Sequence, residues 1–372
     1  MITDKVDFAL IGHPFDIDQL YRYLSYHQPD LNKPRRGLLL KLFERTPPYI
    51  EKEVEMTSSD GQTVRGSIII CPLLPEMVKN NNQSNFRSLC IEKVIAALKL
   101  AREQGAKIAG LGGFTSIADG DQGRLVGRKV PCIAVTSGNT LTAMAAVEAV
   151  IFAGRRINLD LSKATAAVIG ASGDIGTACS RYLATRVRRL VLASTFSFNL
   201  LKIAKELKQY KKAEIIVEKE NIKAISQADM VITAASSVAP IFHQKDFKPG
   251  TIVCDVGYPK NTFIDYKIEN SNIFLFSGGL LSTPSPVFMP FDMGLPDRSV
   301  LYGCWSEAVI LALEGRDDSF STGRGQIVPE RMELIWELAM KHGFSRAPFF
   351  FGKGVWTEEY IDRIRKAKDE HR

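Results

Sequence analysis

The chain lacks the cysteine spacing that marks metal sites and disulfide scaffolds. Its 372 residues include six cysteines, which stand far apart and form no CxxC pair. Zinc sites and disulfide-rich domains both draw on closely spaced cysteines. The sequence therefore predicts no metal site, and this cysteine pattern favours a reducing compartment.

Apolar runs long enough to cross a membrane are also absent. No stretch of about 18 uncharged apolar residues occurs, which predicts no membrane span. Residues 1–7 mix acidic and basic side chains, and no apolar core follows them, unlike a secretory signal. Together with the cysteine pattern, these absences predict a cytoplasmic protein.

Recognisable nucleic-acid modules are missing too, although the net charge is +7. The Lys and Arg residues form short scattered groups, and Cys and His are not spaced as in a zinc finger. We therefore expect no nucleic-acid partner. The basic groups are interpreted either as solvated helix faces or as a docking surface for an acidic partner.

The composition, with 45% hydrophobic and 24% charged residues, is that of a globular protein with room for two domains. Apolar segments that predict strands alternate with segments of helical periodicity, which is typical of an α/β fold. We expect an N-terminal α/β substrate domain over residues 1–160 and a central doubly wound Rossmann domain over 161–296. A C-terminal helical segment over 297–372 is expected to pack back against the preceding domains.

The individual elements are predicted from apolar periodicity and from Gly and Pro punctuation. Strands are expected at 8–14 (ending in a turn), 64–71, 108–111, 133–135, 166–169, 189–193, 215–217, 230–233, 252–255 and 273–276. Helices are expected at 16–25, 87–104, 139–156, 174–185, 200–210, 297–314, 329–342 and 357–372. Loops are expected at 28–37 and 281–296.

A glycine-rich loop between a predicted strand and a predicted helix carries the strongest signal. Gly170 permits a sharp turn, Gly173 permits close approach of a pyrophosphate, and Gly176 permits tight helix packing. An anion would sit at the helix N-terminus. The alternative is a glycine-rich turn that binds nothing. The predicted cofactor-binding residues here are Gly170, Ser172, Gly173, Asp174, Ile175 and Gly176.

The second strand of this domain ends without the acidic residue that usually holds the ribose hydroxyls of NAD. Ser194 and Thr195 stand there instead and can donate to a 2′-phosphate, which favours NADPH. Further cofactor contacts are predicted at Ala235, Ser236 and Gly257, where later strands end at the ligand-binding edge of an open sheet.

Three residues are candidates for the chemistry itself. Tyr258 and Lys260 follow the fifth strand and are placed to polarise a carbonyl, or else belong to a tight turn with an exposed lysine. Cys304 lies on a predicted helix, where a cysteine is usually a core residue and less often a nucleophile.

Ordered segments spread over residues 8–344 resemble the long-chain acyl-[acyl-carrier-protein] reductase family, whose members form fatty aldehydes. The matching stretches are Leu10-Ile11-Gly12-His13, Leu74-Pro75-Glu76-Met77, Leu111-Gly112-Gly113-Phe114-Thr115-Ser116-Ile117, Gly138-Asn139-Thr140, Gly170 to Gly176, Gly257-Tyr258-Pro259-Lys260-Asn261, Cys304 with Glu307-Ala308, Leu313-Glu314-Gly315, Gly323-Arg324, Gln326-Ile327 and Lys341-His342-Gly343-Phe344.

The resemblance implies that Cys304 attacks an acyl thioester of a carrier protein or coenzyme A and that NADPH reduces the resulting acyl-enzyme. It also implies stimulation by magnesium, for which no residues can be named. We expect substrate contacts at Phe114, Thr115 and Asn139. An acidic acyl carrier protein would suit the basic net charge, and a downstream aldehyde-using enzyme is a further expected partner.

The chain departs from the family pattern at several points. Thr195 replaces an arginine, and Leu141 replaces a histidine of a Gly-Asn-Thr-His-Thr segment. Two other interpretations stay open. One is an NAD(P)-dependent small-molecule dehydrogenase of the shikimate or amino-acid type, in which Cys304 is a core residue. The other is a non-catalytic NADP(H)-binding scaffold.

Overall fold

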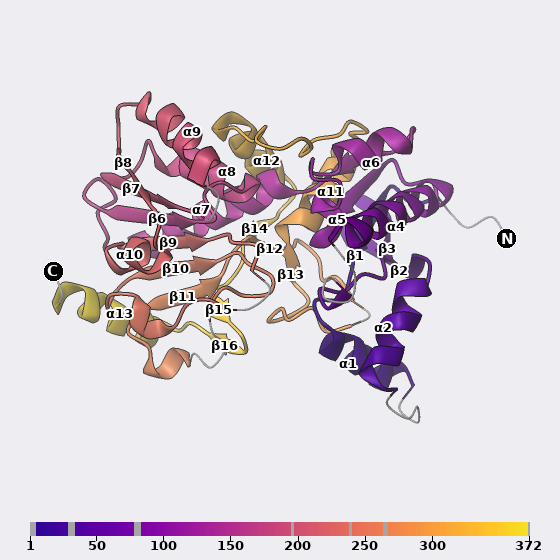
Figure 1. Ribbon diagram of the computed structural model, residues 1–372, viewed down its shortest axis with the longest axis horizontal. Helices are drawn as coiled ribbons and strands as arrows, with labels where there is room; N and C mark the ends of the chain where they lie inside the picture. The colour runs from indigo at the N-terminus through magenta and orange to yellow at the C-terminus, as the bar shows by residue number, and fades with distance from the viewer. Residues whose placement is uncertain are drawn as a thin grey trace. The chain divides into compact units, whose positions relative to one another are not determined.

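The computed structural model describes residues 5–28, 34–77, 83–194, 197–237, 240–262, 267–289 and 291–370 (Figure 1). The chain forms two compact units. The first comprises residues 1–138, 283–326 and 338–345, and the second comprises 139–282, 327–337 and 346–372. Each unit is built around a mostly or wholly parallel sheet, so the α/β class predicted from the sequence is confirmed.

The first unit contains a five-stranded sheet in the order β2-β3-β1-β4-β5. Four strands are parallel, and β2 pairs antiparallel with β3 at one edge. Helix α4 packs on β1 and β3, while α11 packs across β1, β3, β4 and β5. The bounds are β1 (Phe8–Gly12), α1 (Ile17–His27), α2 (Arg36–Arg45), β2 (Tyr49–Thr57), β3 (Thr63–Ile70), α4 (Gln83–Glu103), β4 (Ile108–Leu111), α5 (Phe114–Ile117), α6 (Arg124–Lys129), β5 (Ala134–Thr136), β13 (Val300–Tyr302) and α11 (Gly303–Leu313).

The second unit contains a six-stranded parallel sheet in the order β11-β10-β9-β6-β7-β8. This is the doubly wound order of a Rossmann domain, because the chain starts at β6 in the middle and winds outward in both directions. The bounds are α7 (Asn139–Arg156), β6 (Thr165–Ile169), α8 (Asp174–Leu183), β7 (Arg189–Ala193), α9 (Ser197–Lys208), β8 (Glu214–Glu218), α10 (Asn221–Ser226), β9 (Met230–Thr233), η1 (Gln244–Asp246), β10 (Ile252–Asp255), η2 (Ile268–Asn270), β11 (Phe274–Ser277) and β12 (Leu280–Ser282).

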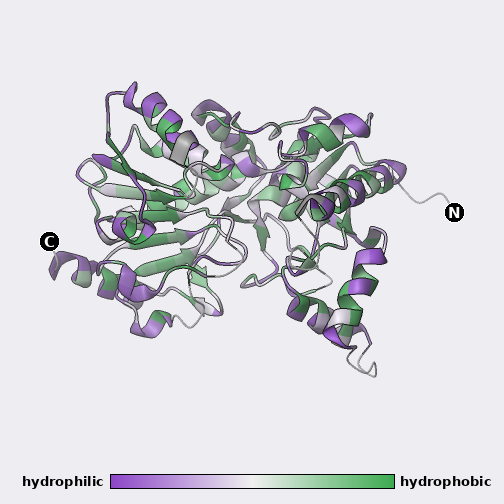
Figure 2. Ribbon diagram, in the orientation of Figure 1, coloured by the Kyte–Doolittle hydropathy of each residue, from purple (hydrophilic) through white to green (hydrophobic). Residues whose placement is uncertain are grey.

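Alternate residues of the central strands enter two separate cores. On β6, Ala166 and Val168 join one apolar cluster, and Ala167 and Ile169 join the other. Strands covered on both faces need apolar residues at every position, which explains why β6 shows no polar alternation. Figure 2 shows the result as green strands between helices whose outer surfaces are purple.

The C-terminal part contributes α12 (Pro329–Lys341), the short strands β14 (Ser345–Arg346), β15 (Phe350–Phe351) and β16 (Gly354–Val355), and α13 (Glu358–Glu370). Helix α13 buries Ile361 and Ile364 in the core of the second unit. Its basic side chains also bind carbonyl groups: Arg365 donates to Arg156 O at 2.7 Å, and the nearly buried Lys368 donates to Ile157 O and Asn158 O. The negative C-terminal end of the α7 dipole attracts these two cations, which anchor α13 to the end of α7.

The structure differs from the sequence predictions in several places. Helix α2 and strand β2 were not predicted, because 38–43 is nearly continuously apolar and the edge strand β2 is half charged. The helix expected at 297–314 begins only at Gly303, after strand β13. Helix α7, expected in the N-terminal domain, groups with the second unit because it packs on α8, β9 and β10. The segment 297–372 is likewise divided between both units.

Replacing Lys368 by Ala should destabilise the second unit. The substitution removes the charge-assisted hydrogen bonds that Lys368 donates to two carbonyl groups. We expect this loss to lower the free energy of unfolding by roughly 2 kcal/mol. We expect the apparent Tm to fall by about 4–8 °C. Lys366→Ala is the matched control, since Lys366 is exposed on the same helix. Equal Tm values for the two variants, measured by circular dichroism, would contradict the anchoring role.

Candidate active site

The candidate cofactor site lies in the second unit, at the carboxyl ends of β6 and β9, where the strand order reverses. Ligands bind at this switch point in doubly wound sheets. Gly170 has φ +76°, and a Cβ added there would lie 2.5 Å from Ala234 O in the loop after β9. A Cβ on Gly176 would overlap Gly170 O. Both positions therefore require glycine, and the N-terminal turn of α8 stays close to the sheet edge.

The loop also presents polar groups suited to an anion. Gly173 caps α8 in an extended conformation, and the first turn of any helix carries amides without an intrahelical acceptor. The hydroxyls of Ser172 and Ser194 lie 2.5 Å apart, so the loop after β6 is joined to the end of β7. The predicted contact Thr195 lies outside the described residues.

Two buried polar residues shape the loops after β9 and β10. Asn261 exchanges hydrogen bonds with the backbone of Ala235, at 3.2 Å from its N and 3.1 Å to its O. Asp255 accepts from the amides of Gly257 and Thr262 at 3.0 and 2.8 Å. These bonds hold the predicted cofactor contacts Ala235 and Gly257 in place, while Ser236 is exposed.

The two candidates for carbonyl polarisation belong to this same turn. The Lys260 ammonium donates to Asp255 O at 2.9 Å and lies 3.7 Å from the centre of the Tyr258 ring. Both contacts stabilise the turn after β10. Asn139, predicted to contact substrate, starts α7 and donates to the Asp174 carboxylate at 3.2 Å. It therefore lies beside the cofactor loop within the second unit.

A separate candidate site is centred on Cys304 in the first unit. Strand β13 delivers the chain to α11, so Cys304 is the second residue of the helix. It is partly exposed, whereas residues 300–303 and 305–311 are all buried. The sulfur thus sits at the positive N-terminal end of a buried helix, with a limited path to solvent.

Four glycines allow this helix end to meet the carboxyl edge of the sheet. A Cβ on Gly138, which follows β5 at φ +66°, would overlap the Cys304 backbone. One on Gly110 would lie 2.8 Å from Ala308 Cβ. Added Cβ atoms on Gly12 and Gly112 would lie 2.5 and 2.8 Å from the Trp305 indole, which donates to Ile11 O. The strand ends therefore form a backbone cradle for α11.

Buried polar groups surround the same helix turn. Glu307, one turn beyond Cys304 and fully buried, accepts from the hydroxyl of Thr136. The Thr136 oxygen also accepts from the amides of Gly138 and Ser321, each at 3.2 Å. Burial raises the pKa of Cys304 to about 12, and the charge of Glu307 acts in the same direction. At neutral pH the free thiol is therefore protonated.

His13 holds the predicted substrate-contact segment. Its Nδ1 donates to Pro14 O at 2.8 Å, and its Nε2 accepts from the Phe114 amide at 2.8 Å. Burial lowers the His13 pKa to about 4, so the ring is neutral and both nitrogens are engaged. Phe114 stacks on this ring with centroids 5.1 Å apart, while Thr115 is buried and donates to Gly112 O.

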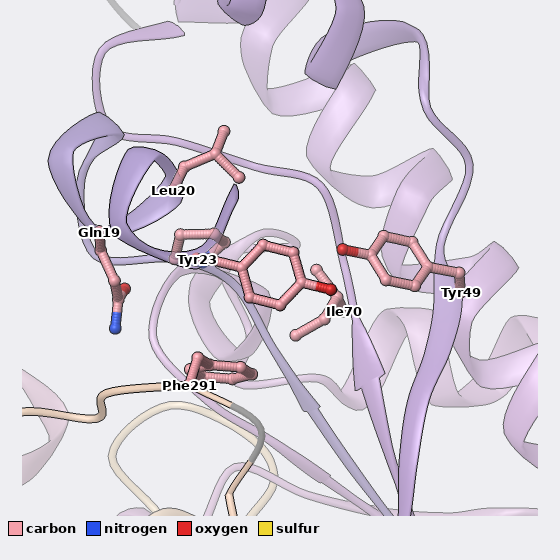
Figure 3. A pocket seen from close by; sticks show the side chains of 7 residues that line it. Gln19, Leu20, Tyr23, Tyr49, Ile70 and Phe291 are labelled. Atoms are coloured by element: carbon pink, nitrogen blue, oxygen red, sulfur yellow. The ribbon is translucent and has the colours of Figure 1, made fainter. Parts of the chain in front are cut away.

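An apolar groove opens in the same unit (Figure 3). It consists of two hollows of about 20 and 320 Å³ that share Gln19, Tyr23 and Phe291. Tyr23 and Leu20 come from α1, and Figure 3 shows the Tyr23 and Tyr49 hydroxyls directed toward one another above Phe291. Phe15, next to the lining residue Pro14, packs edge-on against Tyr302, the residue before α11, at 5.9 Å.

Sequence reasoning did not assign roles to His13, Glu307, Thr136 or Asn261. His13, Glu307 and Asn261 belong to stretches that resemble the family, but nothing in a sequence pattern shows that Glu307 is buried or that Thr136 reaches it. The separation of 171 residues between Thr136 and Glu307 makes that contact a property of the fold.

No described residues form a group of three or more His, Cys, Asp or Glu side chains that could hold a metal ion. Within the described parts of the chain, no helix has the length and apolar character needed to span a bilayer.

Comparison with known proteins agrees with this geometry. Residues 152–277 match the family model described as Shikimate / quinate 5-dehydrogenase, and this range covers β6 to β11 with the glycine loop. The doubly wound sheet, the glycine loop and this match define an NAD(P)-dependent reductase. The match covers the cofactor domain and does not include Cys304.

The chain belongs to the long-chain acyl-[acyl-carrier-protein] reductase family. It is 31% identical over 353 residues to the enzyme of that name from Synechococcus elongatus, covering 91% of this chain and 98% of the relative. It is also 29% identical to Aminotransferase PigE of a Serratia species, over 96% of this chain but only 42% of that protein. The nucleotide-binding domain of glutamyl-tRNA reductase from Thermoplasma volcanium aligns with 36% of this chain and 83% of its own, at 18% identity and a TM-score of 0.25.

Replacing Gly138 by Ala should disturb the position of Cys304. The added Cβ overlaps the Cys304 backbone, so α11 must move away from β5 or the loop must refold. We expect a loss of stability of several kcal/mol, well above the roughly 1–2 kcal/mol that a left-handed conformation alone costs. The readouts are the Tm and the rate at which iodoacetamide labels Cys304.

Gly315→Ala is the matched control for this variant. Gly315 has nearly the same backbone conformation, φ +63°, but has no atom within 4 Å of an added Cβ. Its substitution should cost only the conformational strain and leave the labelling rate of Cys304 unchanged. If both variants lose equal stability and label alike, the cradle around Cys304 is not needed.

Proposed function

We propose that this chain reduces a fatty acyl thioester to a fatty aldehyde with NADPH, through an acyl-enzyme on Cys304. The observation that carries the proposal is the setting of Cys304. Cys304 is a half-buried residue at the N-terminus of a buried helix, where glycines of three strand ends leave room for its backbone. A core cysteine would need neither this partial exposure nor this position on the helix.

In the first step the Cys304 sulfur attacks the acyl carbon of the bound thioester. The bond to the carrier sulfur breaks, and the proton of the Cys304 thiol is transferred to the departing carrier thiol. Because burial keeps the pKa of Cys304 near 12, the thiol loses its proton only as the new bond forms. The positive end of α11 favours the negative charge that develops at the sulfur and at the carbonyl oxygen.

The bound nicotinamide would supply a hydride to the acyl carbon of the Cys304 thioester. For the cofactor, the Gly170–Gly176 loop and the first turn of α8 offer amides to the pyrophosphate, and Gly170 and Gly176 leave the space that this approach requires. Hydride addition leaves the hemithioacetal alkoxide on Cys304. As its C=O bond reforms, the C–S bond breaks, the aldehyde leaves, and the Cys304 sulfur takes up a proton from solvent.

Burial around Cys304 also protects the intermediate. Residues 300–303 and 305–311 shield the thioester from water, so reduction can compete with hydrolysis. His13 acts through the backbone: it positions Phe114 and cannot take a proton readily, because its pKa is lowered to about 4. The larger hollow, of about 320 Å³, is lined in part by Tyr23, Met289 and Phe291 and offers apolar surface for part of an acyl chain.

The proposed substrate carrier is an acyl carrier protein or coenzyme A, in line with the name of the Synechococcus elongatus relative. The preference for NADPH rests on β7, whose end carries Ser194 and no carboxylate among the residues described there. A carboxylate would repel a 2′-phosphate, whereas the Ser194 hydroxyl can donate to it. A downstream aldehyde-using enzyme and a cytoplasmic location stay predictions.

Incubation with an acyl thioester in the absence of cofactor should leave an acyl group on Cys304. Intact-protein mass spectrometry should show one adduct, and adding NADPH should release it as aldehyde. Cys304→Ala should form no adduct and lose at least about a thousandfold in rate, as expected for loss of a nucleophile. Cys132→Ala, which removes an exposed cysteine, should behave as wild type. Normal turnover by Cys304→Ala would exclude the acyl-enzyme.

Replacing Ser194 by Asp should shift cofactor preference toward NADH. The new carboxylate can accept from both ribose hydroxyls and repels the 2′-phosphate, so the ratio of kcat/KM for NADPH over NADH should fall by about tenfold or more. Ser194→Ala is the control, because it removes the donor without adding charge, and should lower the ratio less. An unchanged ratio for Ser194→Asp would remove β7 from the cofactor site.

A further inference from the structure

Helix α2 has a second, outward face that the fold does not use. Its inner face buries Leu39, Leu40 and Phe43 in the first unit. Leu38 and Leu42 point the other way and are each 54% exposed. They are four residues apart and therefore neighbours on the helix surface. Large aliphatic side chains arranged as an exposed pair are a feature of contact surfaces.

Basic residues surround this pair. Arg35, Lys41 and Arg45 are exposed, and at 3.6 residues per turn they fall with the two leucines within about a third of the helix circumference. No carboxylate of the described residues lies within salt-bridge distance of these three cations. Arg36, by contrast, faces sideways and pairs with Glu76 at 3.1 Å. We call Arg35, Leu38, Lys41, Leu42 and Arg45 the α2 stripe.

The α2 stripe is joined to the apolar groove through α1. The Tyr21 hydroxyl donates to Pro34 O at 2.7 Å, immediately before the stripe begins. Glu76, the partner of Arg36, also accepts from the amide of Ile17 at the start of α1. Two turns of α1 then supply Leu20 and Tyr23 to the groove (Figure 3). A ligand with an apolar chain and an acidic body would find both parts on one substructure.

We propose that the α2 stripe docks the acidic carrier protein that delivers the acyl thioester. This inference rests on the proposed function and deepens it. Carboxylates on the carrier would pair with Arg35, Lys41 and Arg45, while an apolar side chain of the carrier covers Leu38 and Leu42. Such a small apolar centre with a charged rim is the ordinary anatomy of a transient protein interface.

Two other occupants fit the stripe less well. A helix that lies on a membrane turns its broad apolar face to the lipid, but the broad apolar face of α2 is buried in the protein. A second copy related by a two-fold axis would bring like-charged stripes together, which is unfavourable. Charge complementarity therefore selects an acidic protein.

The test compares one acyl group on two carriers. The substrates are hexadecanoyl-loaded acyl carrier protein and the uncharged hexadecanoyl thioester of N-acetylcysteamine. The variants are Lys41→Glu/Arg45→Glu and Leu38→Ser/Leu42→Ser. Lys205→Glu/Lys208→Glu is the matched charge-reversal control, since both lysines are exposed on α9 of the other unit. Folding of each variant is checked by its Tm.

Both stripe variants should raise KM for the loaded carrier protein by about tenfold or more, and the charge-reversal variant should also weaken the salt dependence of kcat/KM. Their kinetics with the uncharged thioester should match wild type, as should the α9 control with both substrates. An equal effect on both thioesters, or no effect on either, would overturn the docking role.

Direct binding separates this inference from the proposed function. Binding of the fluorescently labelled carrier protein to wild type and variants is measured by anisotropy, alongside sedimentation with vesicles of 30% phosphatidylserine as a stated probe. If wild type reduces neither thioester, the proposed function fails, and loss of carrier binding in the variants still supports docking. Vesicle binding that depends on the stripe, without carrier binding, would overturn the proposal in favour of a membrane contact.

Discussion

The arrangement around Cys304 in the first unit depends on one close approach, that of Gly138 to the Cys304 backbone. A helix can place its first turn against the ends of parallel strands only if the residues there have no side chains. Gly138, Gly110, Gly112 and Gly12 meet this condition around α11. The same constraint operates in the second unit, where Gly170 and Gly176 let α8 approach the edge of its own sheet. Each helix N-terminus is thereby brought to a sheet edge, where its dipole can act on an anion.

Burial around Cys304 has consequences for the proposed chemistry. It raises the pKa of the thiol, so the unacylated protein carries a protonated and weakly reactive sulfur. The proposed thioester exchange tolerates this, because the proton lost by one thiol is gained by the other. In that proposal, the buried neighbours of Cys304 also favour reduction over hydrolysis of the acyl-enzyme. Within this region the Thr136 hydroxyl donates a hydrogen bond to Glu307, so the buried carboxylate has a partner although it does not reach the solvent.

Much of the second unit could be predicted from sequence, because its strands are buried on both faces and its glycine loop has a strict geometric purpose. Helix α2 could not be predicted, because leucines lie on two of its faces and the apolar residues therefore show no helical periodicity. The start of α11 was misjudged for a related reason. Asp297 looks like a helix cap, but it bonds Ser299 locally and the chain continues as β13 before turning at Gly303. Hence only the structure places Cys304 in the first turn of a helix.

The sequence by itself determined the doubly wound cofactor domain and the lack of a carboxylate at position 194. Its resemblance to known reductases also predicted Cys304 as the nucleophile. These properties follow from local rules of strand burial, turn geometry and residue order. The tertiary structure alone decided that Gly138 presses on Cys304, that Glu307 meets Thr136 and that His13 braces Phe114. Those contacts join residues that lie 101 to 171 positions apart in the sequence. They form only when strands and helices are packed, so no local sequence pattern predicts them.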